Sequence, residues 1–238
     1  MKKTFITFLF LINSATLLCQ DLEDRFTNAL CECYTKIELT TYNNKLIEDL
    51  EACFSSSLGD IDNELAALFY KTYPDTNPED LNEDEAFELG YKFGYEWAQQ
   101  AMINHLDTLI NDCKGLYEAL SISRSYSFVP DTLKIVSRNE IPILDVQIKK
   151  DSTNTSLLLQ RGYHQMVLGA FEKGRKDLHK VLLEYPEEQL SLSLLALSYE
   201  YEENYSMAFK TFKKVDSLYA DLQSKIAIAF LKRKLSTK

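Results

Sequence analysis

The chain has 238 residues, of which 45% are hydrophobic, and it contains only 7 glycines and 5 prolines. This length and apolar content suffice for one or two domains, and the scarcity of Gly and Pro disfavours the many tight turns of a sandwich or barrel. Residues 20–123 carry 22 acidic and 6 basic side chains. So acidic a half argues against binding to nucleic acid, because phosphates attract a positive surface.

Residues 1–19 show the order of regions that is typical of a secretory signal peptide. Lys2 and Lys3 give a basic start, residues 5–12 are almost wholly apolar, and small polar residues follow. The apolar run is shorter than the roughly 18 to 20 residues that cross a bilayer, so we expect cleavage after Cys19 and no membrane span. The exported protein would be periplasmic or secreted.

A lipoprotein is the alternative that this segment leaves open. Leu17, Leu18 and Cys19 resemble a lipobox, in which the cysteine is acylated and anchors the protein to a membrane. The residue before that cysteine is small in the motif, whereas Leu18 is large. We therefore expect plain cleavage, with a lipid anchor at Cys19 as the alternative.

An acidic helical bundle is expected over residues 20–124. Apolar residues recur there at spacings of three and four, which places them on one stripe of a helix. The expected helices are residues 22–37, a segment through Leu46–Phe54, a segment through Leu65–Phe69 capped by Asp60, and a long helix from about Glu83 to near Leu120. Gly90 and Gly94 form G-x-x-x-G in this polar helix, which predicts a close approach of another helix rather than a membrane dimer.

Four cysteines remain after export, and an even count in an oxidising compartment indicates disulfides. Residues two apart on a helix point about 200° apart, so a bond between Cys31 and Cys33 is unfavourable. Cys33 and Cys53 lie on facing apolar stripes, and we therefore predict the pairs Cys33–Cys53 and Cys31–Cys113. The alternative is a zinc site. It is disfavoured because zinc ligands usually come as two close pairs, whereas this chain has one C-x-C and two distant cysteines.

An internal repeat of 34 residues marks the C-terminal part of the chain, where residues 155–188 align with residues 189–222. The matching pairs are Leu158 with Leu192, Gly162 with Ala196, Phe171 with Tyr205, Gly174 with Ala208, Leu178 with Phe212, and Val181 with Val215. This pattern of large, small and aromatic residues resembles the tetratricopeptide-repeat (TPR) family, in an exported bacterial form. The resemblance implies two helical hairpins, in which small residues let helices approach and aromatic residues fill the gaps between hairpins.

The resemblance covers residues 155–222 and sets the expected domain limits. We expect a linker over residues 125–140 and a TPR-like array over residues 141–238. Within the array, a helix begun by Pro142 would belong to a degenerate repeat, and a cap helix would cover residues 221–235. The predicted fold class is all-α, with a disulfide-linked helical bundle followed by a short TPR-like helical-hairpin solenoid.

TPR arrays are scaffolds, in which the first helix of each hairpin lines a groove that holds a peptide or a helix. The resemblance places on this face Leu159, Tyr163 and Met166 in the first repeat, and Ser193, Leu197 and Glu200 in the second. A mostly apolar groove suits a hydrophobic strand or an amphipathic helix. The resemblance implies an adaptor that binds a protein or peptide partner, with no cofactor or metal. Burial of Leu159 and Leu197 by the neighbouring bundle is the alternative for these residues.

Sequence motifs of catalysis are not found. His105 lies near Asp107, but no serine or cysteine nucleophile stands at a suitable spacing, and H-E-x-x-H and G-x-S-x-G are missing. We therefore expect a non-enzymatic protein. The alternative to an adaptor is a periplasmic helical carrier that holds a small apolar ligand in the N-terminal bundle, around Phe69, Trp97 and Met102.

Overall fold

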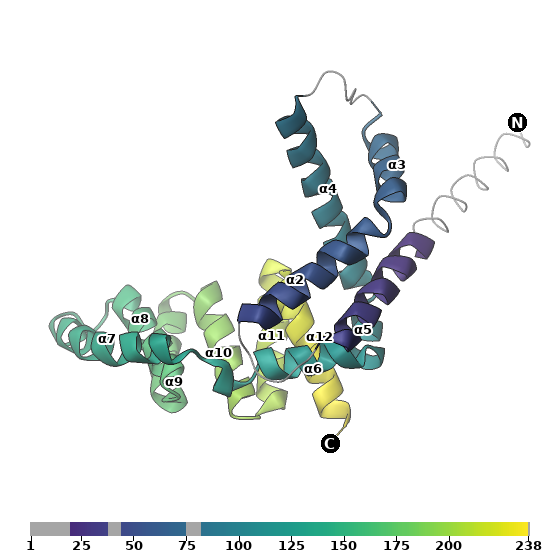
Figure 1. The fold of residues 1–238 in the computed structure, drawn as a ribbon. Helices are drawn as coiled ribbons and strands as arrows, with labels where there is room; N and C mark the ends of the chain where they lie inside the picture. Colours follow the sequence, from purple (N-terminus) through teal and green to yellow (C-terminus); the bar gives the residue numbers. More distant parts are fainter. Residues whose placement is uncertain (1–19, 38–43, 75–81, 238) are drawn as a thin grey trace, which may run out of the picture. The chain divides into compact units, whose positions relative to one another are not determined.

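The computed structural model describes residues 20–37, 44–74 and 82–237. Every element in these ranges is a helix, so the predicted all-α class is confirmed for the described part of the chain (Figure 1). The signal peptide and the lipid anchor at Cys19 were expected within residues 1–19, which lie outside the described residues. Among the helices that are described, none combines the length and the apolar character needed to cross a bilayer.

The chain divides into two compact units, Met1–Ala119 and Leu120–Lys238. The helices of the first unit are residues 20–36, α2 (Asn44–Gly59), α3 (Asp62–Thr72), α4 (Glu83–Asn104), α5 (Leu106–Asp112) and most of α6 (Lys114–Ser123). Helices α3 and α4 pack against each other as a hairpin. The expected acidic helical bundle therefore has more and shorter helices than the sequence pattern indicates.

The long helix that was expected from Glu83 to near Leu120 is broken twice. His105 separates α4 from α5, and Cys113 separates α5 from α6. The backbone of Cys113 is extended, with φ −86° and ψ 95°, and its side chain is bonded to Cys31. The prediction of one continuous helix is wrong, because apolar periodicity runs across both breaks and carries no information on where a distant contact interrupts the helix.

Helix α4 begins where its capping residues indicate. The side chain of Asn82 accepts a hydrogen bond from the Glu85 amide at 2.9 Å, and the Glu85 carboxylate accepts one from the Asn82 amide at 3.2 Å. This capping box satisfies two amides at the helix start. At α3, however, the N-cap residue is the buried Ile61, and no side chain caps the helix. The expected cap at Asp60 is wrong, since burial of Ile61 sets the start of α3.

Two disulfides hold the first unit, one from Cys33 to Cys53 and one from Cys31 to Cys113, with Cα atoms 5.5 Å and 5.4 Å apart. They are the two predicted pairs. The opposite directions of Cys31 and Cys33 on their helix exclude a bond between these two residues, and the facing apolar stripes of Cys33 and Cys53 favour the observed pairing. One bond ties the N-terminal helix to α2, and the other ties it to the residue before α6. The N-terminal helix is thus the common partner of both cross-links.

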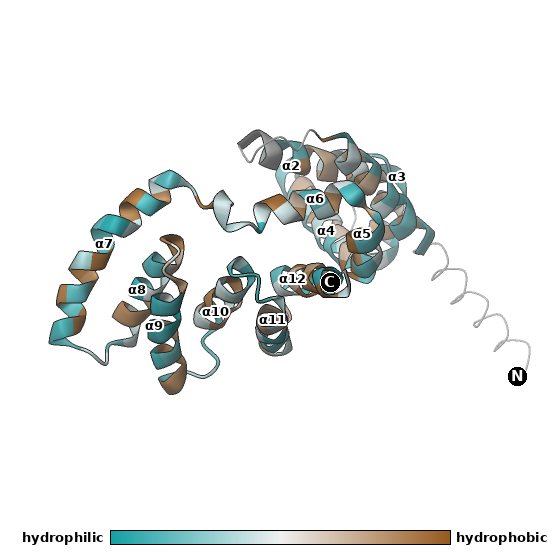
Figure 2. Cartoon of the chain, turned by 90° about the horizontal axis from the view of Figure 1, so that it is seen from below, coloured by the Kyte–Doolittle hydropathy of each residue, from teal (hydrophilic) through white to brown (hydrophobic). Residues whose placement is uncertain are grey.

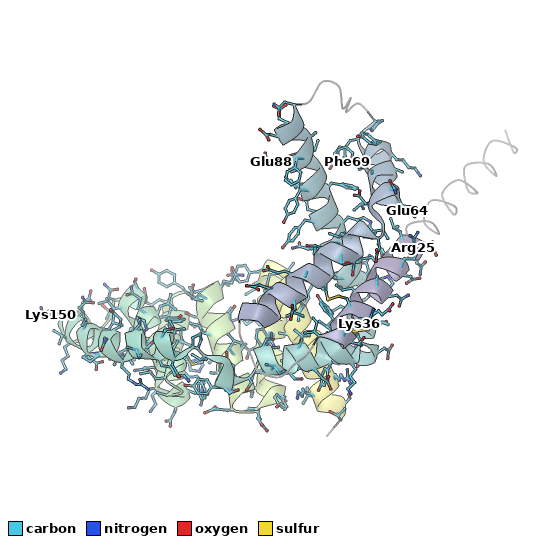
Figure 3. The ribbon with its side chains drawn as sticks, viewed as in Figure 1. Arg25, Lys36, Glu64, Phe69, Glu88 and Lys150 are labelled. Atoms are coloured by element: carbon cyan, nitrogen blue, oxygen red, sulfur yellow. A yellow bond between two sulfur atoms is a disulfide. The ribbon has the colours of Figure 1, made fainter. Side chains whose placement is uncertain are left out.

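This N-terminal helix, residues 20–36, also supplies much of the local core. Phe26 is completely buried and packs edge-to-face on Trp97 of α4, with ring centroids 5.6 Å apart. At the surface, Arg25 donates a hydrogen bond to Glu64 of α3 at 2.9 Å (Figure 3). That hydrogen bond lowers the pKa of Glu64. Because both side chains of the pair are well exposed, it contributes little to stability.

Two helices approach closely at Gly115, whereas Gly94 makes an ordinary side-chain contact and Gly90 makes none. A Cβ atom at Gly94 would lie 3.5 Å from a methyl group of Leu65, and one at Gly115 would clash with the backbone oxygen of Tyr34. No atom lies within 4 Å of such a position at Gly90. The close approach expected from G-x-x-x-G is therefore wrong for Gly90, and Gly94 meets only the side chain of Leu65 at an ordinary contact distance. The close approach at Gly115 has no motif around it.

The second unit is built from successive helical hairpins. After the short 3-10 turn η2 (Tyr126–Phe128), its helices are α7 (Asp131–Lys150), α8 (Thr155–Val167), α9 (Phe171–Glu184), α10 (Gln189–Tyr201), α11 (Tyr205–Tyr219) and α12 (Leu222–Ser236). Helices α8 and α10 begin 34 residues apart, as do α9 and α11. Each of the expected 34-residue repeats therefore contains one hairpin, and α12 lies where the cap helix was expected. From α7 onward, each helix packs against the next (Figure 1).

The linker that was expected over residues 125–140 is mostly helix. Its residues 131–140 form the first half of α7, and Pro142, which was expected to begin a helix, lies inside α7. Leu144 and Ile148 of α7 are buried against α8 and α9. The polar composition of the stretch therefore reflects a helix with one narrow buried stripe, and not an unstructured connection.

Small residues bring α8 and α9 together in the first hairpin. A Cβ atom at Gly162 would lie 3.1 Å from a methyl group of Leu178, and one at Gly174 would lie 3.0 Å from the sulfur of Met166. Figure 2 shows hydrophobic and hydrophilic residues alternating around the helices of this unit, as expected when each helix buries one face. The two glycines of the first repeat therefore have the packing role that their positions predict, and their counterparts Ala196 and Ala208 are completely buried.

Candidate functional site

The six residues predicted to bind a partner lie on α8 and α10, which contact each other. They divide into two groups by exposure. Four of them are partly exposed and are called the open face from here on: Leu159 and Tyr163 on α8, and Ser193 and Leu197 on α10. The other two, Met166 and Glu200, are each only 4% exposed. Leu159 also packs against the core cluster that contains Leu158 and Val181. The structure therefore leaves four of the six positions partly accessible.

The two buried positions have partners within the second unit. The sulfur of Met166 packs beside the backbone of Gly174 in α9. The carboxylate of Glu200 accepts hydrogen bonds from Arg124, which directly follows α6. Sequence reasoning placed both residues on the correct helices, but it did not foresee that residues from outside the repeats would cover one of them.

The contact between Arg124 and Glu200 is a buried two-point ion pair. The Nε and Nη2 atoms of Arg124 donate to the two carboxylate oxygens at 2.7 Å and 2.6 Å, and the two side chains are 13% and 3% exposed. The guanidinium carbon lies 5.4 Å from the ring centre of Phe212 and 5.8 Å from that of Phe230. The pKa of the neighbouring Tyr201 is raised, mainly by burial and to a smaller extent by the negative charge of Glu200. The carboxylate requires this partner, because an unpaired buried charge is strongly destabilising.

Tyr126 reaches from η2 to the turn between α8 and α9. Its hydroxyl donates to the carbonyl of Val167 at 2.9 Å, and its ring packs on Phe171 and Tyr201 with centroids 5.1 Å and 5.5 Å away. Gly169 in this turn has φ +73°, and a Cβ atom there would lie 2.8 Å from the Tyr126 hydroxyl oxygen. Glycine alone combines this backbone conformation with this contact.

A separate groove of about 750 Å³ is lined by α7, α8 and α9. Arg161 of α8 donates to both carboxylate oxygens of Asp177 in α9, at 2.7 Å and 2.8 Å, and to Asp145 of α7 at 2.7 Å. The hydrogen bond to Asp177 raises the pKa of Arg161 above its ordinary value. Arg161 therefore links the three helices through one guanidinium group.

The positive side chains of Lys173, Lys176 and Lys180 also line this groove, together with His179. Gln165 also lines it, and the Oε1 atom of Gln165 is buried without a hydrogen-bond partner among the described residues. The groove suits an anionic group. The sequence repeat could not reveal it, because position 195, which corresponds to Arg161, holds a leucine and the repeat pattern follows apolar residues.

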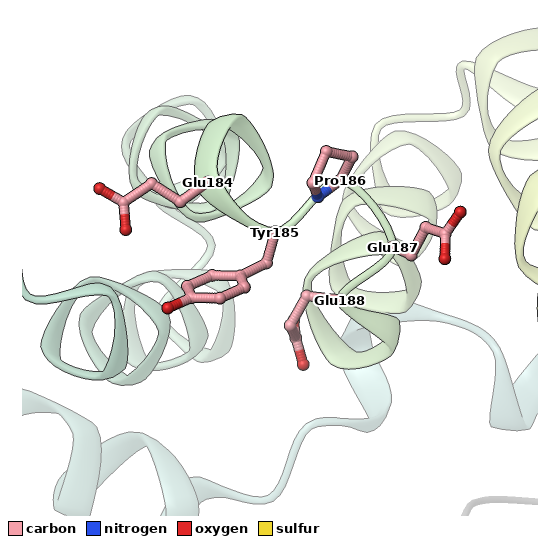
Figure 4. Close-up of a pocket in the computed structure, with 5 residues that line it drawn as sticks. All are labelled: Glu184, Tyr185, Pro186, Glu187 and Glu188. Atoms are coloured by element: carbon pink, nitrogen blue, oxygen red, sulfur yellow. The ribbon is translucent and has the colours of Figure 1, made fainter.

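A smaller pocket of about 450 Å³ lies at the turn that joins α9 to α10 (Figure 4). It is lined by Glu184, Tyr185, Pro186, Glu187 and Glu188. Tyr185 is 55% exposed, and Leu183 beside it is 83% exposed. These exposed side chains, with three carboxylates around them, form a second surface on which a partner with apolar and positive groups could be held.

The histidine considered for catalysis contacts two acids from another helix. The Nε2 atom of His105 lies 3.3 Å from the carboxylate of Glu23, and its Nδ1 atom lies 3.5 Å from that of Asp24. In the part of the chain that the structure describes, no group of three or more His, Cys, Asp and Glu side chains is arranged to hold a metal ion. The described cysteines are joined in disulfides and offer no free thiol.

The residues named for a ligand carrier lie in an aromatic part of the first unit. The ring of Phe69 lies 5.3 Å from that of Phe93, and Trp97 packs on Phe26. The indole nitrogen of Trp97 is buried and has no hydrogen-bond partner among the described residues. Met102 is partly exposed. The carrier function stays a prediction.

A row of exposed aromatic rings on α4 was not found by sequence reasoning. Phe87, Tyr91 and Tyr95 are 75%, 65% and 44% exposed, and consecutive rings stack with centroids 6.2 Å apart. The available signal was their spacing of four residues, which places them on one face of a helix. Such a row is a candidate interaction surface of the first unit.

Comparison with known proteins gives no relative, since no family model, curated protein or solved structure matches the chain. The resemblance to the TPR family therefore rests on the 34-residue period and stays a prediction. The structure establishes an all-α protein with two disulfides in the first unit and consecutive helical hairpins in the second.

Proposed function

We propose that the protein is an exported, non-enzymatic adaptor that holds a protein or peptide on the open face of α8 and α10. The main support is the recurrence of partly exposed side chains at equivalent positions of two successive hairpins. Leu159 corresponds to Ser193, and Tyr163 corresponds to Leu197. Covering such side chains with an apolar segment is favourable by about 25 cal/mol for each Å² removed from water.

The partner that fits this face is an amphipathic helix or an extended apolar segment. Leucine and tyrosine side chains offer apolar area, and the Tyr163 hydroxyl and Ser193 can direct a polar group of the partner. Export is supported by the two disulfides of the first unit, because disulfides persist in oxidising compartments. The proposal therefore has two parts: the hairpins form a TPR-like array, and this array acts as an adaptor.

The test is a full-length chain that carries Tyr163→Ala and Leu197→Glu. Cells that express the wild type or this variant are treated with a cross-linker, and the protein is purified with whatever is bound to it. We expect one specific protein partner with the wild type and a loss of about tenfold or more with the variant, because a new carboxylate is costly to bury. Circular dichroism of the two purified chains should coincide.

The matched control makes the same chemical changes elsewhere, as Tyr185→Ala with Leu183→Glu at the α9–α10 turn, where both side chains are exposed. Retention of the partner by the control, with loss by the first variant, locates binding on the open face. If both variants keep the partner, or only the control loses it, the proposal fails. In the latter case the pocket at the turn is the binding site.

A further inference from the structure

The segment between α6 and α7 places two side chains in the hairpin array. Arg124 and Tyr126 belong to residues 124–130, which contain only the short turn η2. Arg124 contacts α10, α11 and α12, whereas Tyr126 contacts the α8–α9 turn and α10. The second unit therefore holds a short segment of its own chain through side-chain anchors, much as a groove holds a bound peptide.

The first anchor site is built for a guanidinium group. Glu200 is buried and receives two parallel hydrogen bonds from Arg124, while the rings of Phe212 and Phe230 lie near the guanidinium. A planar guanidinium can donate both bonds and still contact aromatic rings, which a lysine ammonium group cannot do equally well. The negative charge of the site is complementary to the positive charge of this anchor.

The second anchor site is built for a tyrosine. The hydroxyl of Tyr126 reaches the Val167 carbonyl, one of the last carbonyls of α8, which lack partners within the helix. The ring packs on Phe171 and Tyr201, and Gly169 leaves room for the hydroxyl. Phenylalanine would fill the same volume but would lose the hydrogen bond. Together, the two anchor sites fit a segment in which an arginine is followed two residues later by a tyrosine.

We propose that this pair of sites recognises peptide segments with that arginine–tyrosine pattern, and that the chain occupies the sites with its own segment until a segment of a partner protein displaces it. The two anchor sites include α10 but share no residue with the open face, so the inference does not depend on the proposed function. Because the internal segment is tethered, it competes at a high effective concentration. An external segment therefore binds more weakly to the wild type than to a chain whose own anchors are removed.

The probe is a fluorescent peptide with the sequence of residues 120–130, and its binding to full-length chains is measured by fluorescence anisotropy. Arg124→Ala with Tyr126→Ala frees both anchor sites, and we expect this variant to bind the probe at least about tenfold more tightly than the wild type does. Adding Glu200→Gln to the same variant should weaken binding by about tenfold, because the arginine then meets a neutral amide.

A second peptide, with alanine in place of the arginine and the tyrosine, is the control probe. Circular dichroism checks the fold. If the alanine variant unfolds, Arg124→Lys with Tyr126→Phe keeps similar side-chain volumes while removing the paired hydrogen bonds and the hydroxyl. Equal binding of both probes to the freed chain, or binding of neither, overturns the proposal. A wild-type dimer that dissociates in the lysine–phenylalanine variant overturns it too, since the occupant is then a second copy of this chain.

Discussion

Two arginines of the second unit, Arg124 and Arg161, are each oriented by a buried carboxylate. Glu200 is 3% exposed and Asp177 is 4% exposed, whereas Asp145, the second partner of Arg161, is 46% exposed. A carboxylate removed from water depends on its partner for charge compensation, whereas an exposed one is compensated by water and salt. The two carboxylates that hold Arg161 should therefore differ widely in their importance.

Replacement of Asp177 by alanine should destabilise the second unit by about 3 kcal/mol, because Arg161 would keep a largely buried charge with only one partner. The matched change Asp145→Ala removes a carboxylate from the same guanidinium at an exposed position, and it should cost at most about 1 kcal/mol. Urea unfolding followed by circular dichroism measures both values. Equal losses for the two variants would contradict the role given to burial.

At the scale of helices, glycines decide where two backbones meet. Gly115 of α6 leaves no space for a Cβ atom beside the Tyr34 backbone, and the nearest obstruction is main chain, which cannot rotate away. Gly90 of α4 is exposed and has open space around it. The same residue type is therefore essential for packing in one helix and replaceable in the other.

Gly115→Ala should destabilise the first unit by about 2 kcal/mol or more, since α6 must move away from the N-terminal helix. Gly90→Ala should instead stabilise it by about 0.5 to 1 kcal/mol, because alanine has the better helix propensity and the methyl group meets nothing. Thermal unfolding of the two single variants measures the difference. A shift of the same sign in both would refute this reading of the two glycines.

The helix boundaries show which features of the fold the sequence patterns predicted and which they missed. Helices α8 to α11 follow the predicted 34-residue period, because apolar residues and small residues within each hairpin specify local packing. The breaks at His105 and Cys113 and the length of α7 were missed. At Cys113 the chain follows a disulfide to Cys31, 82 residues away, and no local pattern reports such a contact.

At the scale of the whole molecule, cross-links are confined to one unit. The sequence has no cysteine after Cys113, so residues 120–238 depend on packing, hydrogen bonds and ion pairs without a disulfide. In the first unit, the two disulfides close loops with sequence separations of 20 and 82 residues. Loops of these sizes correspond to about 3 to 5 kcal/mol of stabilisation for each bond. The two units should therefore respond differently to a reducing agent.

Dithiothreitol should unfold the first unit and leave the second unit helical. Far-ultraviolet circular dichroism should fall only in part, and limited proteolysis with mass spectrometry should leave a protected fragment that begins near residue 120. The oxidised protein in the same buffer is the control, and both units should resist the protease there. Complete loss of the helical signal, or no change at all, would contradict the prediction that only the first unit depends on the disulfides for its stability.

The sequence by itself determined the all-α class and the hairpin period of the second unit, because these follow from the spacing of residues along a helix. It also excluded a bond between Cys31 and Cys33 and favoured the observed cysteine pairs through their apolar stripes. Only the tertiary structure decided which predicted face residues stay accessible. Glu200 is covered by Arg124, 76 positions earlier, and Tyr126 binds a carbonyl 41 positions later. Contacts between such distant residues depend on how helices pack, and helix packing brings together positions that no local spacing relates.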